Sequence, residues 1–317
     1  MPIWVVPAAG VPVPEPVPEP VMVPLATGST LATWTMAGEG ARRHSTPVVF
    51  LHGGPGLYTE ARRFDEGAVL RAAGFDTIYF DQAGGGRSAL LKAGEYSLER
   101  AIADLEALRI ALRQEQLVLW GNSYGATLLA LYADRYPGRV AGVLLTSPGM
   151  FPGFAGKRDY GRTDRDKVVY DKAVMAAIKR IDRDGGAAEA VLPQPEAGKL
   201  FDALVADELV NAMVCKGSSV RPAALPGGGN LFAQRLIDRD LKALKFTPAG
   251  VGSVQKPTLI VRGSCDYVPA VSAERFRAVF GGTIVDVPDS GHGLLENRAV
   301  VVAAMDGFAR GALDGVK

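Results

Sequence analysis

The chain has 317 residues, of which 48% are hydrophobic and 22% charged, and its formal net charge at pH 7 is +1. This composition is typical of a globular protein with one large core, and the balanced charge without a basic run argues against nucleic acid or a membrane surface as a partner. Cys215 and Cys265 fit no metal-ligand spacing and cannot form the dense disulfide framework of a small secreted domain. We therefore expect reduced thiols and a cytoplasmic location.

The first 24 residues are predicted to form an extended, proline-rich arm. Proline recurs at every second position from Pro12 to Pro20, which removes helix hydrogen-bond donors and favours a polyproline-like conformation. The stretch lacks the basic start and unbroken apolar centre of a signal peptide. No other segment supplies the roughly 18 consecutive apolar residues of a transmembrane helix, so we expect no membrane span.

Short apolar runs alternate with helical patterns along much of the remaining chain. In one helical pattern Leu98, Ile102, Leu105 and Leu112 recur at the spacing of a core-facing helix, and Ser97 stands at its N-cap position. Continuous apolar strands alternating with such helices predict a mostly parallel sheet covered on both faces, which is an α/β fold. The predicted strands are Val48–Leu51, Thr77–Phe80, Leu117–Trp120, Val140–Thr146, Thr258–Arg262 and Thr283–Val287.

The alternation stops between residues 148 and 251. Charged helical stretches replace it, and strand character returns at Pro257. We predict one core, residues 25–147 and 252–317, that carries a helical cap, residues 148–251, over the carboxyl ends of the strands, where open α/β sheets bind ligands. The predicted cap helices are Asp166–Ile181, Asp202–Val214 and Leu231–Leu244.

The segment Gly121-Asn122-Ser123-Tyr124-Gly125 matches the G-x-S-x-G pattern of a nucleophilic serine. It follows the apolar run 117–120 and opens a helical run, which is the strand-turn-helix setting that the pattern requires. A nucleophile on so sharp a turn has a strained backbone, and the flanking glycines avoid side-chain clashes across the turn. We predict Ser123 as the nucleophile; the alternative is a glycine-rich turn with an incidental serine.

A serine hydroxyl needs a base, and histidine is the usual one near neutral pH. In this kind of fold the order along the chain is serine, acid, histidine. Of the three histidines, His44 and His52 precede Ser123, so only His292 qualifies. It lies in a glycine-flanked loop after the last predicted strand, and the alternative is an exposed loop histidine.

The third member of the triad is an acid that orients the imidazole. Asp266 comes just after the strand 258–262, at its carboxyl end, and is our candidate. Asp286 lies inside a strand, and Asp289 is too close to His292 in sequence to reach around the ring. A surface-turn aspartate is the alternative reading of Asp266.

The segment His52-Gly53-Gly54-Pro55-Gly56 follows the strand 48–51, where such folds build half of the oxyanion hole. We predict the backbone N–H groups of Gly54 and Tyr124 as oxyanion donors, each typically worth about 3 kcal/mol of transition-state stabilisation. His52 is predicted to organise the loop through hydrogen bonds. A tight turn without function is the alternative.

Residues 81–88, Asp-Gln-Ala-Gly-Gly-Gly-Arg-Ser, follow the strand 77–80. Their glycines lack both the Lys-Ser/Thr pair of a phosphate-binding loop and the spacing of a dinucleotide fingerprint. We predict a structural role in which Asp81 and Arg87 brace the loops behind the nucleophile.

Together these motifs resemble the proline iminopeptidase (prolyl aminopeptidase) family of α/β-hydrolase-fold serine hydrolases, over roughly residues 45–148 and 252–310. The resemblance implies the α/β-hydrolase fold with a helical cap, no metal or other cofactor, and release of an N-terminal residue, often proline, from a peptide or small amide. It also implies the oxyanion donors Gly54 and Tyr124. The matching segments are His52–Gly56, Asp81–Ser88, Trp120–Gly125, Gly263–Asp266 and Ser290–His292.

The cap departs from this pattern. Family members that grip the free amino group of the substrate use cap glutamates, one of them in a Pro-Asn-Glu-like segment. The counterpart here is Gly229-Asn230-Leu231, with leucine in place of glutamate. Asp207 and Glu208, on a predicted cap helix, are candidate replacements for substrate binding; the alternative is that they are solvated helix charges.

We therefore predict a cofactor-free serine hydrolase that forms an acyl-enzyme. The first choice is an aminopeptidase of the proline iminopeptidase type, and the second is an amidase or esterase acting on a small molecule. Epoxide hydrolases and haloalkane dehalogenases need an aspartate where this chain has Ser123. A non-catalytic binding protein on this scaffold would usually lose members of the triad.

Overall fold

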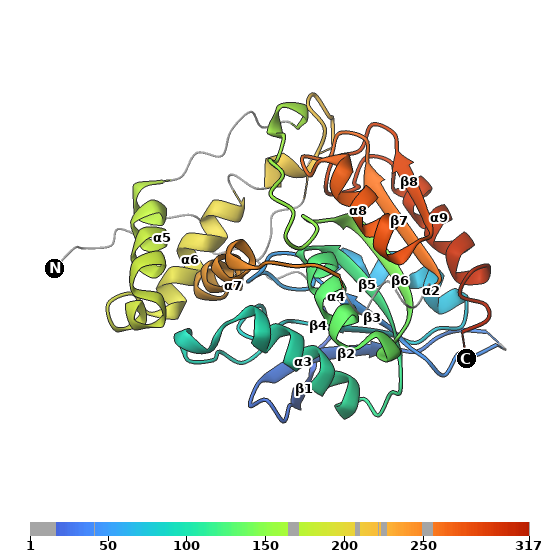
Figure 1. Cartoon of the computed structure of the whole chain (residues 1–317), viewed down its shortest axis with the longest axis horizontal. Helices are drawn as coiled ribbons and strands as arrows, with labels where there is room; N and C mark the ends of the chain where they lie inside the picture. Colours follow the sequence, from blue (N-terminus) through green and yellow to red (C-terminus); the bar gives the residue numbers. More distant parts are fainter. Residues whose placement is uncertain are drawn as a thin grey trace.

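The computed structural model describes residues 17–40, 42–163, 171–206, 210–220, 222, 227–248 and 256–316. An eight-stranded sheet runs through the core in the order β1-β2-β4-β3-β5-β6-β7-β8 (Figure 1). The β1–β2 and β2–β4 pairs are antiparallel, and every later pair is parallel. The strands are β1 (Val21–Pro24), β2 (Thr30–Met36), β3 (Val48–Leu51), β4 (Thr77–Phe80), β5 (Leu117–Ser123), β6 (Val140–Pro148), β7 (Thr258–Gly263) and β8 (Thr283–Val287).

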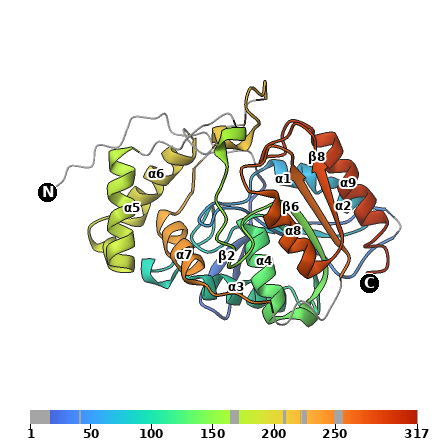
Figure 2. The ribbon, with the colours of Figure 1, turned by 45° about the horizontal axis from the view of Figure 1, so that its top comes forward.

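Helices cover both faces of the sheet (Figure 2). Alternate residues of β3 show why its sequence is apolar throughout: Val49 and Leu51 pack into the cluster with α3, α4 and α8, while Val48 and Phe50 pack into the cluster with α1, α2 and α9. A strand buried on both faces has no position for a polar side chain. These helices are α1 (Arg62–Glu66), α2 (Ala68–Ala72), α3 (Leu98–Ala111), α4 (Tyr124–Arg135), α8 (Ala270–Phe280) and α9 (Arg298–Arg310).

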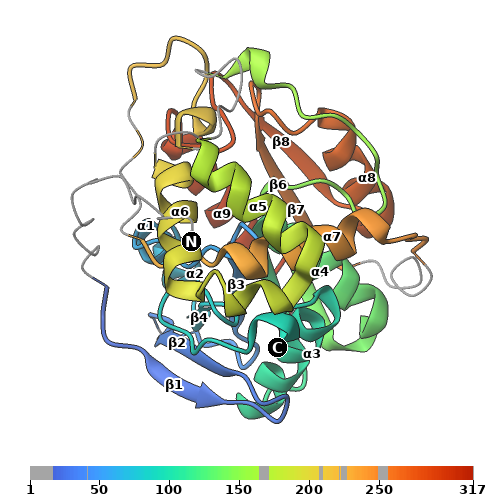
Figure 3. The same cartoon turned by 90° about the vertical axis from the view of Figure 1, so that its left-hand side faces the viewer.

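The described part of the segment between β6 and β7 contains helices and one isolated bridge, Thr163–Cys215, but no strand. Helices α5 (Lys172–Asp184), α6 (Gln194–Leu204) and α7 (Leu231–Ala243) lie together on one side of the core (Figure 3). They share a separate apolar cluster that also includes Leu91 and Tyr96 from the core. The start of α7 contacts the loops that follow the carboxyl ends of β3 and β4: the N–H of Asn230 donates to the carbonyl of Gly56, and the N–H of Gly86 donates to the carbonyl of Gly228, both at 2.8 Å.

The predicted parallel sheet with helices on both faces is confirmed, and β3, β4 and β8 have the predicted boundaries. Helix α3 begins after Ser97, whose side chain accepts a hydrogen bond from the N–H of Arg100, as the N-cap prediction requires. Residues 21–24 of the predicted arm form the edge strand β1, and β2 was not predicted. The helix expected over 202–214 was wrong, because α6 ends at Leu204 and a short 3₁₀ helix occupies 210–213.

No helix in the described part of the chain combines the length and apolar character that crossing a bilayer requires.

Candidate active site

Ser123 is the last residue of β5, and α4 begins at the next residue. Its backbone has φ +51° and ψ −121°, a conformation that is costly for any residue with a Cβ atom. The neighbouring glycines make the turn feasible: a Cβ atom at Gly121 would lie 2.8 Å from the Cα of Ala126, and one at Gly125 would lie 2.6 Å from the carbonyl carbon of Leu51. The strained turn is thus packed directly between β3 and α4.

The three residues predicted as a triad form one hydrogen-bonded chain. The Nε2 atom of His292 lies 2.9 Å from the Oγ of Ser123, and its Nδ1 lies 2.8 and 3.0 Å from the two carboxylate oxygens of Asp266. Since a carboxylate only accepts hydrogen bonds, Nδ1 carries the proton and Nε2 is free to accept one from the serine hydroxyl. His292 and Asp266 are both 3% exposed, so this arrangement is shielded from water.

Asp266 reaches His292 because three parallel strands end at the same edge of the sheet: β5 carries Ser123, the turn after β7 carries Asp266, and the loop after β8 carries His292. One Asp266 oxygen also accepts the N–H of Val268 at 2.8 Å, which fixes the carboxylate. The rival Asp286 is instead paired with Arg262 at the surface.

Two aromatic rings pack in sequence against the imidazole of His292. The ring of Tyr267 lies 4.4 Å from the ring of His292, and that of Tyr160, from the cap, lies 4.9 Å from Tyr267. The N–H of Asp159 donates to the carbonyl of Tyr267 at 2.8 Å. Burial raises the pKa of the Tyr267 phenol, so the hydroxyl stays neutral and the stack adds no charge beside His292.

The two predicted oxyanion donors lie on either side of the serine. Tyr124 is the first residue of α4, so its N–H has no acceptor within the helix. Gly54 lies in the loop after β3, whose preceding residue Gly53 is so near that a Cβ there would be 3.1 Å from the Cβ of Ser123. Among the described residues, no hydrogen bond uses the N–H of Gly54.

His52 lies beneath this loop and is 2% exposed. Its Nε2 accepts the N–H of Gln82 at 2.8 Å, and its Nδ1 lies 2.7 Å from the carbonyl of Gly53. Burial lowers the pKa of His52 to about 4, which keeps the ring neutral with its proton on Nδ1. These contacts match the predicted loop-organising role.

Asp81 joins the same loops through backbone groups. Its carboxylate accepts the N–H of Thr59 at 2.8 Å and the N–H of Arg87 at 2.9 Å. Burial raises its pKa to about 6. The guanidinium of Arg87 points elsewhere, toward Glu19 at 3.6 Å, so the backbone of Arg87 rather than its charge meets Asp81.

A buried charge network behind Ser123 was missed in the sequence. The guanidinium of Arg63, 3% exposed, donates to the side chain of Asn122 at 3.0 Å and to Glu66 at 2.7 Å. Arg62 donates to the carbonyl of Gly293, beside His292, at 3.1 Å, and also pairs with Glu60. Burial alone would raise the pKa of Glu60, but these two arginines lower it to about 2. In the sequence, such charges look like those of any solvated helix.

The cap segment that departs from the iminopeptidase pattern has a structural role here. Asn230 is 3% exposed and caps α7, and its amide donates to the carbonyl of Gly84 at 3.2 Å. Its backbone N–H donates to the carbonyl of Gly56 at 2.8 Å. Leu231 is fully buried in the cap cluster. The other cap candidates, Asp207 and Glu208, lie outside the described residues.

The expectation of reduced cysteines is wrong, because Cys215 and Cys265 form a disulfide with their Cα atoms 5.6 Å apart. The bond joins the cap to the turn that carries Asp266. Their separation of 50 residues hides the pairing in the sequence, since only the folding of the cap onto this turn brings them together.

Comparisons with known proteins agree with this architecture. The family model of the alpha/beta hydrolase fold matches residues 46–173. The chain is 31% identical over 161 residues to the 1-acylglycerol-3-phosphate O-acyltransferase ABHD5 of Rattus norvegicus, covering 49% of this chain and 43% of that protein. It is 37% identical over 112 residues to the probable proline iminopeptidase of Streptomyces coelicolor, covering 32% of this chain and 33% of that protein.

Among solved structures, the serine hydrolase CCSP0084 of Cycloclasticus zankles superposes with a TM-score of 0.63 at 14% identity, over 93% of this chain and 99% of that chain. The prediction of an α/β-hydrolase fold is thereby confirmed. The matched region spans less than half the length of these two curated relatives.

Proposed function

We propose that this protein is a serine hydrolase that works through an acyl-enzyme. The observation that carries the proposal is the continuous hydrogen-bonded chain from the Oγ of Ser123 through His292 to Asp266. It stands at the carboxyl edge of a parallel sheet, on a strained turn that presents the hydroxyl.

The first step is attack of Ser123 on a substrate carbonyl. The Nε2 of His292 takes the hydroxyl proton as the new carbon–oxygen bond forms, and Asp266 stabilises the imidazolium. The N–H groups of Gly54 and Tyr124 donate to the developing oxyanion. His292 then returns the proton to the leaving amine or alcohol, which departs and leaves Ser123 acylated.

The second step repeats the proton transfers with water. A water molecule loses a proton to His292 and attacks the ester carbonyl of the acyl-enzyme, and the proton passes to Ser123 as the acid product leaves. Both steps use only this chain's own side chains and backbone.

For the substrate, our first proposal is an amide or peptide with a free N-terminal residue, as in proline iminopeptidases. The resemblance in the five motifs and the identity to the Streptomyces coelicolor protein support it. The second candidate, a small-molecule amidase or esterase, is favoured by one observation: Leu231 is buried where iminopeptidases carry an amine-binding glutamate.

The test compares the wild type with Ser123→Ala on p-nitroanilides and p-nitrophenyl esters. We expect the variant to lose at least about 10⁴-fold in kcat and to lose labelling by a fluorophosphonate. Ser45→Ala, at an exposed serine, is the matched control and should behave as wild type. Unchanged turnover by Ser123→Ala would end the proposal.

The substrate class is decided by pairs of prolyl and alanyl p-nitroanilides, each with a free or an N-acetylated amine. An aminopeptidase cleaves only the free form, whereas the second candidate cleaves the free and the N-acetylated form of a substrate at similar rates.

A further inference from the structure

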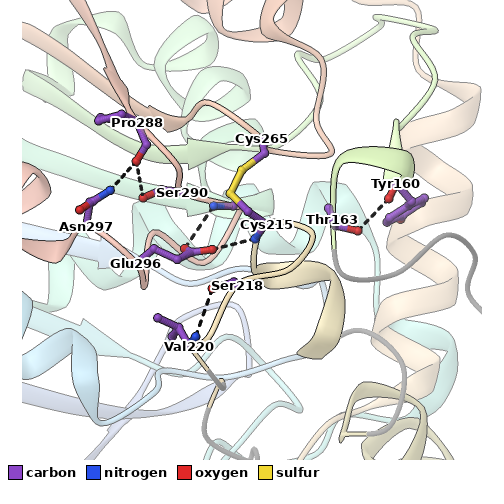
Figure 4. Close-up of a disulfide and its surroundings, with 11 residues drawn as sticks. Tyr160, Thr163, Cys215, Ser218, Val220, Cys265, Pro288, Ser290, Glu296 and Asn297 are labelled. Atoms are coloured by element: carbon purple, nitrogen blue, oxygen red, sulfur yellow. Dashed lines mark hydrogen bonds between the residues drawn. A yellow bond between two sulfur atoms is a disulfide. The ribbon is translucent and has the colours of Figure 1, made fainter.

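Three segments from distant parts of the sequence meet around the disulfide between Cys215 and Cys265 (Figure 4). They are the acid turn, Gly263–Asp266; the histidine loop, Pro288–Gly293; and a stretch of the cap, Met213–Cys215, which we call the clamp segment. The close-up shows Cys215 joined to Cys265, with Glu296 beside them. The proposed function assigns no role to the contact of the clamp segment with the acid turn and the histidine loop.

The acid turn and the histidine loop are joined through their backbones. The N–H of Cys265 donates to the carbonyl of Ser290 at 3.1 Å, and the N–H of Ser264 donates at 2.9 Å to the carbonyl of Val287, the last residue of β8 before the histidine loop. Gly263 allows this approach, since a Cβ there would lie 2.5 Å from the carbonyl oxygen of Gly291. The two loops therefore form one unit that carries both Asp266 and His292.

The clamp segment lies directly on the histidine loop. The N–H of Gly293 donates to the carbonyl of Met213 at 2.7 Å. Two residues earlier, a Cβ at Gly291 would lie 2.7 Å from the Cα of Val214. His292 is thus flanked on both sides by residues that contact the backbone of the cap.

Glu296 joins the same two segments with one carboxylate. Its Oε1 accepts the N–H of Cys215 at 2.7 Å, and its Oε2 accepts the N–H of Gly291 at 3.2 Å. Hydrogen bonds from backbone N–H groups to a carboxylate are charge-assisted and stronger than those between neutral groups. Glu296 is a polar anchor between the cap and the histidine loop.

The disulfide is the covalent anchor. It ties Cys215 of the clamp segment to Cys265, whose next neighbour in the chain is Asp266. Both cysteines are half-buried. The acid side of the unit is held covalently and the histidine side by Glu296.

We propose that the clamp segment positions the Asp266–His292 pair for catalysis, with Glu296 and the Cys215–Cys265 disulfide as its positioning residues, and that reduction of this disulfide lowers the catalytic rate. A dithiol reductant supplies two electrons and two protons: the sulfur–sulfur bond becomes two thiols, and the reductant becomes a disulfide. The proposal rests on the proposed function, because it requires serine-dependent turnover as the readout.

The experiment measures kcat and KM of the wild type during a redox titration with dithiothreitol, with free thiols counted at each point. Since a displacement of about 1 Å can cost about 10²-fold in rate, we expect kcat to fall at least about 10-fold with KM nearly unchanged. The fall should follow the appearance of two thiols with a two-electron midpoint, and reoxidation should restore it.

The Cys215→Ala/Cys265→Ala double variant should show the rate of the reduced wild type and no response to dithiothreitol. Both Glu296 variants should lower kcat with the disulfide intact. Glu296→Gln, which keeps one acceptor oxygen, should have the smaller effect and Glu296→Ala the larger. Glu274→Gln, at an exposed carboxylate that pairs with Arg277 on α8, is the matched control and should keep the wild-type rate. If the double variant fails to fold, the wild-type titration and the Glu296 variants decide the matter.

A fully reduced wild type with unchanged kcat would overturn the clamp, as would a double variant that is slowed further by dithiothreitol. Fluorophosphonate labelling separates the two failures. Equal labelling rates in the oxidised and reduced protein, with Ser123→Ala unlabelled, remove only the clamp. Turnover that does not depend on Ser123 removes the proposed function itself.

Discussion

The substitution Gly125→Ala tests whether the backbone of β3 sets the position of the nucleophile. In the structure, a Cβ atom at Gly125 would overlap the carbonyl of Leu51 and would lie 2.6 Å from its carbon and 2.9 Å from the carbonyl oxygen of His52. Ordinary contacts between carbon atoms are about 3.5–4.0 Å. The first turn of α4 must therefore move about 1 Å away from β3, because a central strand cannot retreat.

That movement carries Ser123 with it, since only one residue separates the two. Its hydroxyl is 2.9 Å from the imidazole of His292, so a shift of this size breaks the hydrogen bond. We expect kcat to fall at least about 10²-fold. The overpacked site should also lower the free energy of unfolding by about 1–3 kcal/mol.

The assay combines kcat and KM on a p-nitroanilide substrate, the rate of fluorophosphonate labelling, and urea unfolding. Gly138→Ala is the matched control, because no atom lies within 4 Å of its added methyl group, and it should match wild type in kcat and in labelling. A Gly125→Ala protein with wild-type kcat and labelling rate would refute the reasoning, since the turn at Ser123 would then tolerate a side chain for which the structure has no room.

Three further outcomes are expected. Asp266→Asn should lower kcat about 10⁴-fold with little change in KM, because His292 loses the carboxylate that fixes its tautomer; steady-state kinetics on the folded variant checks this. Gly307→Ala, at an exposed position of α9 with no atom within 4 Å of the new methyl group, should raise the free energy of unfolding by about 0.5–1 kcal/mol in urea. The third concerns the dependence of the free energy of unfolding on pH, to which two buried groups contribute in opposite directions. Burial raises the pKa of Asp81 from 3.8 to about 6, so its contribution to stability is lost as pH rises from 3.8 to 6. Burial lowers the pKa of His52 from 6.5 to about 4, so the protein loses stability as pH falls from 6.5 to 4. Asp81→Asn removes the first slope, so the His52 slope, a loss of about 3 kcal/mol between pH 6.5 and 4, is no longer offset. A variant whose unfolding free energy changes with pH over this range no more than that of wild type contradicts the prediction.

The strands of the core were predictable because a strand that is buried on both faces has a continuously apolar sequence. Strands such as Val48–Leu51 have no polar position. β1 was hidden by Pro24 at its end and by Pro20 just before it, and an edge strand tolerates proline because one side of its backbone makes no ladder hydrogen bonds. Helix α6 was misplaced because its start signal, a proline within the first turn, was overlooked.

The candidate site also has a part that the sequence predicts and a part that it does not. Ser123, Asp266 and His292 follow a fixed order after successive strands, so elimination among few candidates could find them. The disulfide and the Glu296 contacts depend on where the cap lies relative to the core, and no local pattern encodes that. The burial of Arg63 was equally hidden in the sequence. It depends on the packing of α1 against Asn122, behind the turn at Ser123, and not on the spacing of Arg63 to Glu66.

The cap meets the core at the loops that carry the chemistry. Asn230 contacts the loop 52–56 through the carbonyl of Gly56 and the loop 81–88 through the carbonyl of Gly84, while the clamp segment contacts the loop of His292. The position of the iminopeptidase glutamate is occupied by Leu231, which is fully buried in the cap cluster and presents no charge to a substrate amine. If this protein binds a free amine, the carboxylate must come from a residue other than position 231, and an activity that survives N-acetylation of the substrate would mean that a free amine is not recognised at all.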